Sequence, residues 1–151
     1  MRAIVVLNRN ASLVSQLNAC GHICLGLGNK LETANLMLRS FNDADGNNVA
    51  ILTDHPLIVL SARSSSHIRD AHVLARRAGI PANAFFSCMT TGEPANQEVS
   101  VAETPPDNLE YVALALYGDG ASLKPITKRF SLYRHGDSKL SPDDAPLETA
   151  G

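Results

Sequence analysis

The fold of this chain is decided by residues Ile4–Gly28, IVVLNRNASLVSQLNACGHICLGLG. The first residues form a short run rich in β-branched side chains, which is typical of a buried strand. After a polar connection, Ser12 is suited to begin a helix because its hydroxyl can accept a hydrogen bond from the first turn. We expect a strand over Arg2–Asn8 and a helix over Leu13–Leu27, ended by the glycine at position 28. A strand followed directly by a helix indicates an α/β fold.

The spacing of apolar residues predicts which side of the first helix is buried. The residues that share this side at helical spacing are Leu13, Leu17, Cys20, Cys24 and Leu27. Free cysteines on such a side behave as small apolar residues. Asn18 and His22 are four residues apart and share a neighbouring side of the helix. Gly26 continues their line by one turn and would leave room for another group to approach.

Strands and helices alternate along the rest of the chain. The pair Asp45-Gly46 lies between two apolar runs and predicts a β-hairpin, so we expect a mixed sheet. The further expected elements are hairpin strands at Asn35–Phe41 and Asn48–Thr53, a strand at Leu57–Ser61, a helix at Ser65–Ala78, a strand at Ala84–Met89, a short helix at Ala95–Ala102, a strand at Glu110–Tyr117, and a short helix and strand before Arg134. The sequence therefore predicts one α/β domain over residues 1–134, with a mixed sheet of four to five strands and helices on both faces.

Composition and charge exclude several classes of protein. The chain has 151 residues and a formal net charge of −2, and no apolar run approaches the roughly 18 residues that a membrane span needs. Three cysteines at no disulfide-like spacing fit a reducing compartment, so we expect a cytoplasmic location. Residues 135–151 hold one lysine against four acidic residues, a net charge of −3, which leaves +1 for residues 1–134. This segment predicts a flexible acidic tail, and the nearly neutral body is not typical of a strong nucleic-acid binder.

Three groups of segments together resemble a known family. They are IVVLN with SQLNACGHICLGLG, VLSARSSSHIRDAHVLARRAGI with FFSCMTTG, and LEYVALALYGDGASLKPITKRFSLYR. This combination resembles a bacterial family of unknown function that is related to the type-2 peptidyl-tRNA hydrolases. The resemblance implies a peptidyl-tRNA hydrolase II-like fold over residues 1–134. Because those hydrolases cleave the ester between a peptide and tRNA, it also implies hydrolysis of such an ester.

The resemblance also implies a site around His22, which stands where the hydrolases carry a histidine on their first helix. His22 would act as an acid or base, Asn18 would orient the substrate, and Thr91 would stabilise developing charge. Arg9 is the basic residue of the first loop, where the hydrolases carry a lysine. Thr90 lies near the later loop that completes their site.

Two further groups of residues are candidates for substrate binding. Glu93 follows a predicted strand together with the two threonines, and strand ends are where open α/β sheets place ligands. Lys124, Lys128, Arg129 and Arg134 form a basic cluster that could hold the phosphates of tRNA or of a smaller ligand. We expect neither a cofactor nor a metal.

Each of these features has an alternative interpretation. His22 could be a core histidine bonded to a backbone carbonyl, and the threonine loop could be an ordinary polar loop. Cys20, Cys24 and Cys88 could form a thiolate metal site, although core positions are the commoner use of such residues. The basic cluster could be a solvated surface. The protein as a whole could be a non-catalytic module that binds a small ligand or a protein partner, and an exposed strand edge or helix face could support a homodimer.

Overall fold

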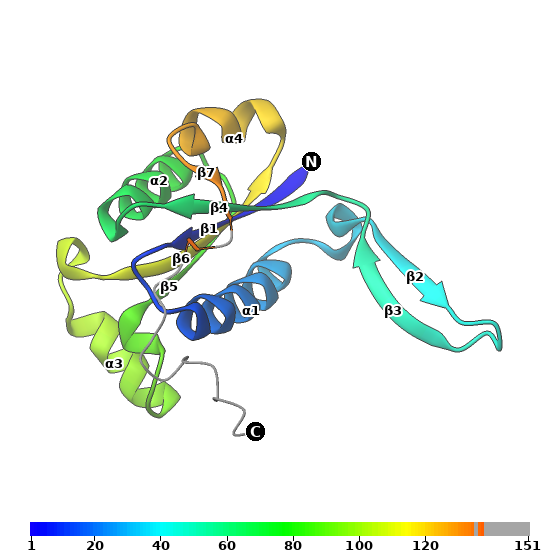
Figure 1. The fold of residues 1–151 in the computed structure, drawn as a ribbon, viewed down its shortest axis with the longest axis horizontal. Helices are drawn as coiled ribbons and strands as arrows, with labels where there is room; N and C mark the ends of the chain where they lie inside the picture. Colours follow the sequence, from blue (N-terminus) through cyan, green and yellow to red (C-terminus); the bar gives the residue numbers. More distant parts are fainter. Residues whose placement is uncertain (135, 138–151) are drawn as a thin grey trace, which may run out of the picture.

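A five-stranded sheet forms the centre of the computed structural model, which describes residues 1–134, 136 and 137 (Figure 1). The strand order is β5-β6-β1-β4-β7. The strands are β1 (Arg2–Asn8), β4 (Leu57–Ala62), β5 (Ala82–Phe86), β6 (Tyr111–Gly118) and β7 (Ser131–Leu132). Strands β1 and β4 are parallel, and the other neighbours are antiparallel. The predicted mixed sheet is therefore confirmed, while all of the predicted tail except residues 136 and 137 lies outside the described residues.

Helices cover both faces of this sheet, as predicted. Helix α1 (Leu13–Lys30) lies on one face, and α2 (Ser65–Arg77) and α4 (Gly120–Thr127) lie on the other (Figure 1). Helix α3 (Pro94–Glu103) follows the edge strand β5 and packs against the short turn at Ser87–Met89. Two further short turns lie at Thr33–Leu36 and Pro106–Asn108. Among the described helices, none combines the length and the apolar character needed to cross a membrane.

Each face of the sheet has its own apolar core. The α1 side is built around Val5, Leu7 and Ile23, and the α2 side is built around Val6, Leu60 and Ile68. Consecutive residues of β1 therefore enter opposite cores, as the alternation of side chains along a strand requires. All eight residues of β6 are buried because this strand lies inside the sheet with helices over both faces.

The buried side of α1 differs from the predicted one. Its buried residues are Gln16, Ala19, Ile23 and Leu27, whereas Leu13 and Leu17 are 37% and 63% exposed. The carboxamide of Gln16 donates to the carbonyl oxygens of Asn8 and Ala11 and accepts from the hydroxyl of Tyr133. A polar side chain with all its partners can be buried at little cost, so Gln16 takes a place that the apolar pattern had assigned to leucines.

The end of α1 also differs from the prediction. The helix runs through Gly28 and ends at Lys30, two residues beyond the expected stop. The ammonium of Lys30 donates to the carbonyl oxygen of Ala82, 2.9 Å away on β5. A cation in the last turn also interacts favourably with the helix dipole, so two interactions of Lys30 stabilise the extra turn.

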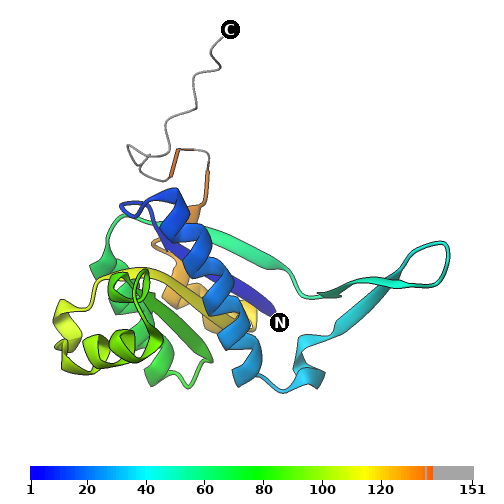
Figure 2. The ribbon, with the colours of Figure 1, turned by 90° about the horizontal axis from the view of Figure 1, so that it is seen from below.

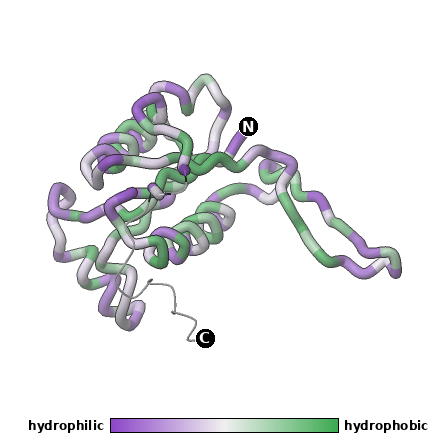
Figure 3. Tube along the Cα trace, in the orientation of Figure 1, coloured by the Kyte–Doolittle hydropathy of each residue, from purple (hydrophilic) through white to green (hydrophobic). Residues whose placement is uncertain are grey.

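The predicted hairpin forms, but outside the main sheet. Among the described residues, strands β2 (Leu38–Asn42) and β3 (Asn48–Thr53) pair only with each other, and they project from the body (Figures 1 and 2). The main sheet is mixed because β5, β6 and β7 run against their neighbours, not because of the hairpin. We call residues 37–53 the arm. Figure 3 shows that apolar residues continue along the arm, far from either core.

Candidate functional site

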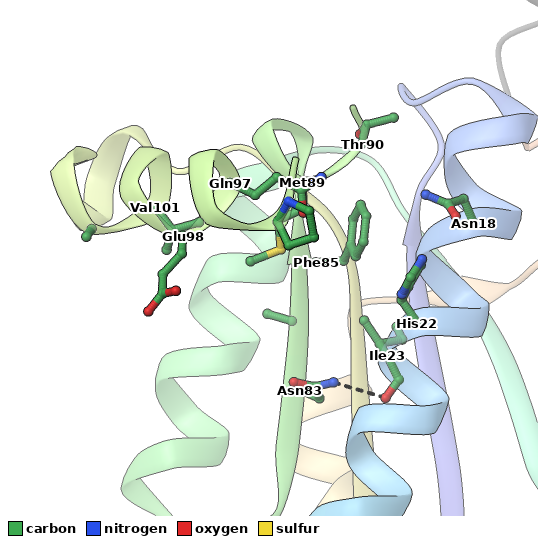
Figure 4. Close-up of a pocket in the computed structure, with 13 residues that line it drawn as sticks. Asn18, His22, Ile23, Asn83, Phe85, Met89, Thr90, Gln97, Glu98 and Val101 are labelled. Atoms are coloured by element: carbon green, nitrogen blue, oxygen red, sulfur yellow. Dashed lines mark hydrogen bonds between the residues drawn. The ribbon is translucent and has the colours of Figure 1, made fainter. Parts of the chain in front are cut away.

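A cleft of about 770 Å³ opens between α1, the edge strand β5 and α3 (Figure 4). Asn18 and His22 come from α1, and Phe85 comes from β5. The remaining lining residues are Ile23, Asn83, Ala84, Met89, Thr90, Pro94, Gln97, Glu98, Val101 and Ala102. The cleft thus combines an apolar floor with a few polar side chains.

His22 is exposed and points into this cleft, so its interpretation as a core histidine is wrong. Its ring lies beside the ring of Phe85, with centroids 5.8 Å apart and planes at 30°. Asn18 lies one helical turn earlier on the same side (Figure 4). Neither polar side chain is hydrogen-bonded to another described residue, so both can bond to a ligand.

Asn83 closes the end of the cleft nearest to the C-terminus of α1. Its amide nitrogen donates to the carbonyl oxygen of Ile23 at 3.1 Å, and its amide oxygen accepts from Lys30 at 3.2 Å. A Cβ atom added to Gly26 would lie 2.5 Å from this amide nitrogen. The space beside Gly26 is therefore taken by Asn83 and not by a ligand.

The far wall of the cleft depends on Gln97 of α3. Its amide nitrogen donates to the carbonyl oxygens of Thr91 and Gly92, at 3.2 and 3.1 Å. Gly92 has a φ of +90°, a conformation that favours glycine. These bonds tie the loop to α3 and leave the Thr90 side chain at the cleft. Thr91 and Glu93 are exposed and lie outside the lining.

The structure brings only some of the predicted residues together. Asn18, His22 and Thr90 share the cleft. Arg9 is exposed at the end of β1. Lys124, Lys128 and Arg129 of the basic cluster belong to α4 and its C-terminal end, on the opposite face of the sheet from α1, and Arg134 follows β7 (Figure 1). Within that cluster, Arg129 forms an ion pair with Asp70 of α2 at 2.8 Å.

Lys124 and Lys128 of this cluster also lie apart from the cleft. Lys124 lines a shallow depression with Arg2 and Phe130, and Lys128 is exposed at the end of α4. Neither lysine nor arginine is among the residues that line the cleft. A phosphate bound in the cleft would therefore have no cation from this cluster beside it.

Sequence reasoning missed the floor and the far wall of the cleft. The missed residues include Phe85, Met89, Gln97 and Glu98. A short helix was expected over Ala95–Ala102, and Gln97, Glu98 and Val101 share one side of such a helix. That spacing was the available signal that these three side chains lie together. It does not reveal that this side of α3 faces α1.

The three cysteines do not come together. Cys20 and Cys24 pack against the core on the α1 side, and Cys88 packs against the other core. A shared thiolate metal site is therefore not formed. The pKa of Cys20 is lowered to about 7 because its thiolate accepts a hydrogen bond from Cys24, and the same interaction raises the pKa of Cys24.

The comparisons with known proteins give a family and a fold. A structure of a protein of unknown function from Agrobacterium tumefaciens strain C58 matches with a TM-score of 0.77 and 22% identity, over 88% of this chain and 97% of that one. Comparison with curated proteins gives no match. Neither description that does match names a peptidyl-tRNA hydrolase. The model of the family described as "Protein of unknown function (DUF2000)" matches residues 1–134, so the chain belongs to the DUF2000 family.

Proposed function

We propose that the cleft binds a small, largely uncharged organic ligand and that His22 is the group that hydrogen-bonds it. The observation that carries this proposal is the exposed His22 ring, which borders a cleft of about 770 Å³ and has no partner among the described residues. Cleft volumes of roughly 300–1,000 Å³ with an apolar lining and few polar groups are typical of small-molecule sites. Glu98 is the one formally charged residue of the lining, which favours a neutral ligand over a polyanion.

A second candidate function is hydrolysis of an ester in the same cleft. It is favoured by the position of Asn18, one turn from His22, and of Thr90 on the opposite wall. The imidazole could activate a water molecule as a general base, a role that histidine commonly has in enzymes. The amide and the hydroxyl could hold the carbonyl group of the ester. A peptidyl ester is the substrate class that the resemblance to the hydrolases suggests.

The position of the basic residues bears on whether tRNA is part of the proposed substrate. Lys124, Lys128 and Arg129 lie on the other face of the sheet and cannot hold a phosphate beside His22. The ester alone, without its nucleic acid, is therefore the simpler substrate for the cleft. A tRNA requirement would show as activity that falls steeply with salt.

The test compares two probes that share an acyl group. N-acetylphenylalanine methyl ester can be hydrolysed, whereas the corresponding amide should only bind. Turnover of the ester, lost in His22→Ala and kept in His67→Ala on α2, would support the hydrolase. Shifts of the His22 ring signals on titration with the amide, without ester turnover, would support binding alone. Absence of both effects, with peptidyl-tRNA also left intact across a range of salt, would contradict the proposal.

A further inference from the structure

The outer side of α1 carries an apolar stripe in addition to the buried one. In 18 residues this surface helix carries a single formally charged residue, Lys30. Its outer side runs along Leu13, Leu17, Gly21 and Leu25 at helical spacing, and Leu17 and Leu25 are 63% and 79% exposed. Adjoining exposed apolar side chains on a soluble protein ordinarily mark a contact surface. The outer side of α1 therefore requires a cover that the described residues do not supply.

The arm requires a cover for the same reason. Its two strands pair only with each other, and an isolated two-stranded hairpin is at best marginally stable in water. Leu38 and Ile51 lie on the face turned toward α1, while Phe41 and Leu52 lie on the opposite face. All four side chains are exposed. Both faces of the arm are thus apolar and solvent-accessible.

The arm and the C-terminal half of α1 enclose an apolar groove of about 590 Å³. Gly21, Leu25 and Gly28 form its helical wall, and Leu38 and Ile51 form its arm wall. A Cβ atom added at Gly21 or Gly28 would meet nothing within 4 Å, so this wall is open to close approach by another element.

The exposed apolar area matches that of a dimer interface. The exposed apolar residues on α1, on the arm face turned toward it and beside the groove are Leu13, Val14, Leu17, Leu25, Met37, Leu38, Val49, Ile51 and Leu57. About half of each of these nine residues is exposed, which gives roughly 500 Å² if burying one such side chain removes about 100 Å² of apolar area from water. About two thirds of the roughly 800 Å² that each partner contributes to a stable homodimer interface is apolar, so the two areas agree, and this patch lies near the upper end of the 300–600 Å² of a typical monomer.

We propose that a second copy of this chain covers the surface, with the two α1 helices packed antiparallel around Gly21. A two-fold axis at Gly21 places Leu13 and Leu17 of each copy against Leu25 and the groove of the other. In this arrangement, α1 of each copy supplies one wall of its own groove and also the residues that fill the partner's groove. Such self-complementarity is what a two-fold interface demands, so the occupant is another copy and not a different protein.

The dimer does not depend on the function proposed for the cleft. Asn18 and His22 lie beside the apolar side of α1, at the border between the dimer surface and the cleft. The test therefore leaves both residues unchanged. Light scattering of the full chain during gel filtration should give twice the mass of 16.1 kDa. Leu17→Glu and Leu25→Glu should each give the monomer mass with an unchanged circular dichroism spectrum, because these side chains are exposed within one copy.

Leu132→Glu is the matched control, because Leu132 on β7 is 61% exposed and lies away from α1 and the arm. This variant should remain a dimer. A second test uses Gly21→Cys in a chain whose three natural cysteines are replaced by alanine. Mild oxidation should cross-link Gly21→Cys across the two-fold axis, whereas Leu132→Cys in the same background should stay uncross-linked. A wild-type chain of monomer mass, a dimer that survives both α1 substitutions, or no cross-link at position 21 would overturn the proposal.

Discussion

Cys20 is a single residue whose chemistry depends on its neighbour one helical turn away. The hydrogen bond from Cys24 stabilises the Cys20 thiolate and lowers its pKa to about 7, against the opposing effect of burial. Since the thiolate is the reactive form, alkylation of Cys20 by iodoacetamide should rise with pH and level off above a midpoint near 7. The measurement is the rate of Cys20 modification across pH, followed by mass spectrometry of peptides. Cys24→Ala should move the midpoint upward. A wild-type rate that still rises steeply above pH 9 would contradict the assignment.

The orientation of α1 shows why single residues are hard to place from sequence. Asn18 and His22 could be assigned to one side of the helix because that depends on spacing alone. The sequence could not show which side of the helix is buried, because apolar residues lie on both sides of α1. The choice depends on Gln16, whose oxygen accepts a hydrogen bond from Tyr133, 117 residues later. A local pattern contains no information on such a partner.

At the scale of elements, α1 and β5 meet at Gly26 and Asn83, and this contact sets one end of the cleft. Gly26→Ala should lower the free energy of unfolding by about 1–2 kcal/mol, because the new methyl group displaces an amide that bonds to Ile23 and Lys30. In an Asn83→Ala chain, Gly26→Ala should raise the free energy of unfolding by about 0.5–1 kcal/mol, because alanine has a higher helix propensity than glycine.

Urea unfolding of the four chains tests this contact as a double-mutant cycle. Opposite signs of the Gly26→Ala effect in the two backgrounds are expected. An effect of the same sign and size in both would show that Asn83 is not the group that keeps position 26 small.

Elements with local signals could be predicted well, and their partners could not. The strand Arg2–Asn8, the helix starting at Ser65 and the hairpin all follow from short patterns, and all are present. The hairpin was expected in the main sheet and instead forms the arm, because pairing between distant strands is not encoded in a turn sequence. The same limit hid the far wall of the cleft, where Gln97 of α3 faces α1 across the edge of β5.

At the scale of the whole molecule, stability should depend on pH through His72. Its Nδ1 atom lies 3.0 Å from the Tyr111 hydroxyl, between α2 and β6. Burial, and then the positive charges of Arg76 and Lys30, lower the pKa of His72. The unfolded chain therefore takes up a proton near pH 6.5, while the folded chain keeps this ring neutral to a lower pH. The contribution of neutral His72 to the free energy of unfolding is fully present above pH 6.5 and is lost as the pH falls below that value.

The free energy of unfolding should thus decrease between pH 7.5 and pH 5.5, by up to about 1.4 kcal/mol per pH unit for one such group. His72→Gln keeps a hydrogen-bonding side chain toward Tyr111 but cannot titrate, so its decrease should be smaller than that of the wild type. Urea unfolding at both pH values measures the difference, with His67→Gln on the same helix as the control for loss of a histidine. Protein concentration must be equal throughout, because a dimer gains apparent stability with concentration. Equal pH dependence in the wild type and His72→Gln would show that the contact between α2 and β6 does not hold His72 neutral.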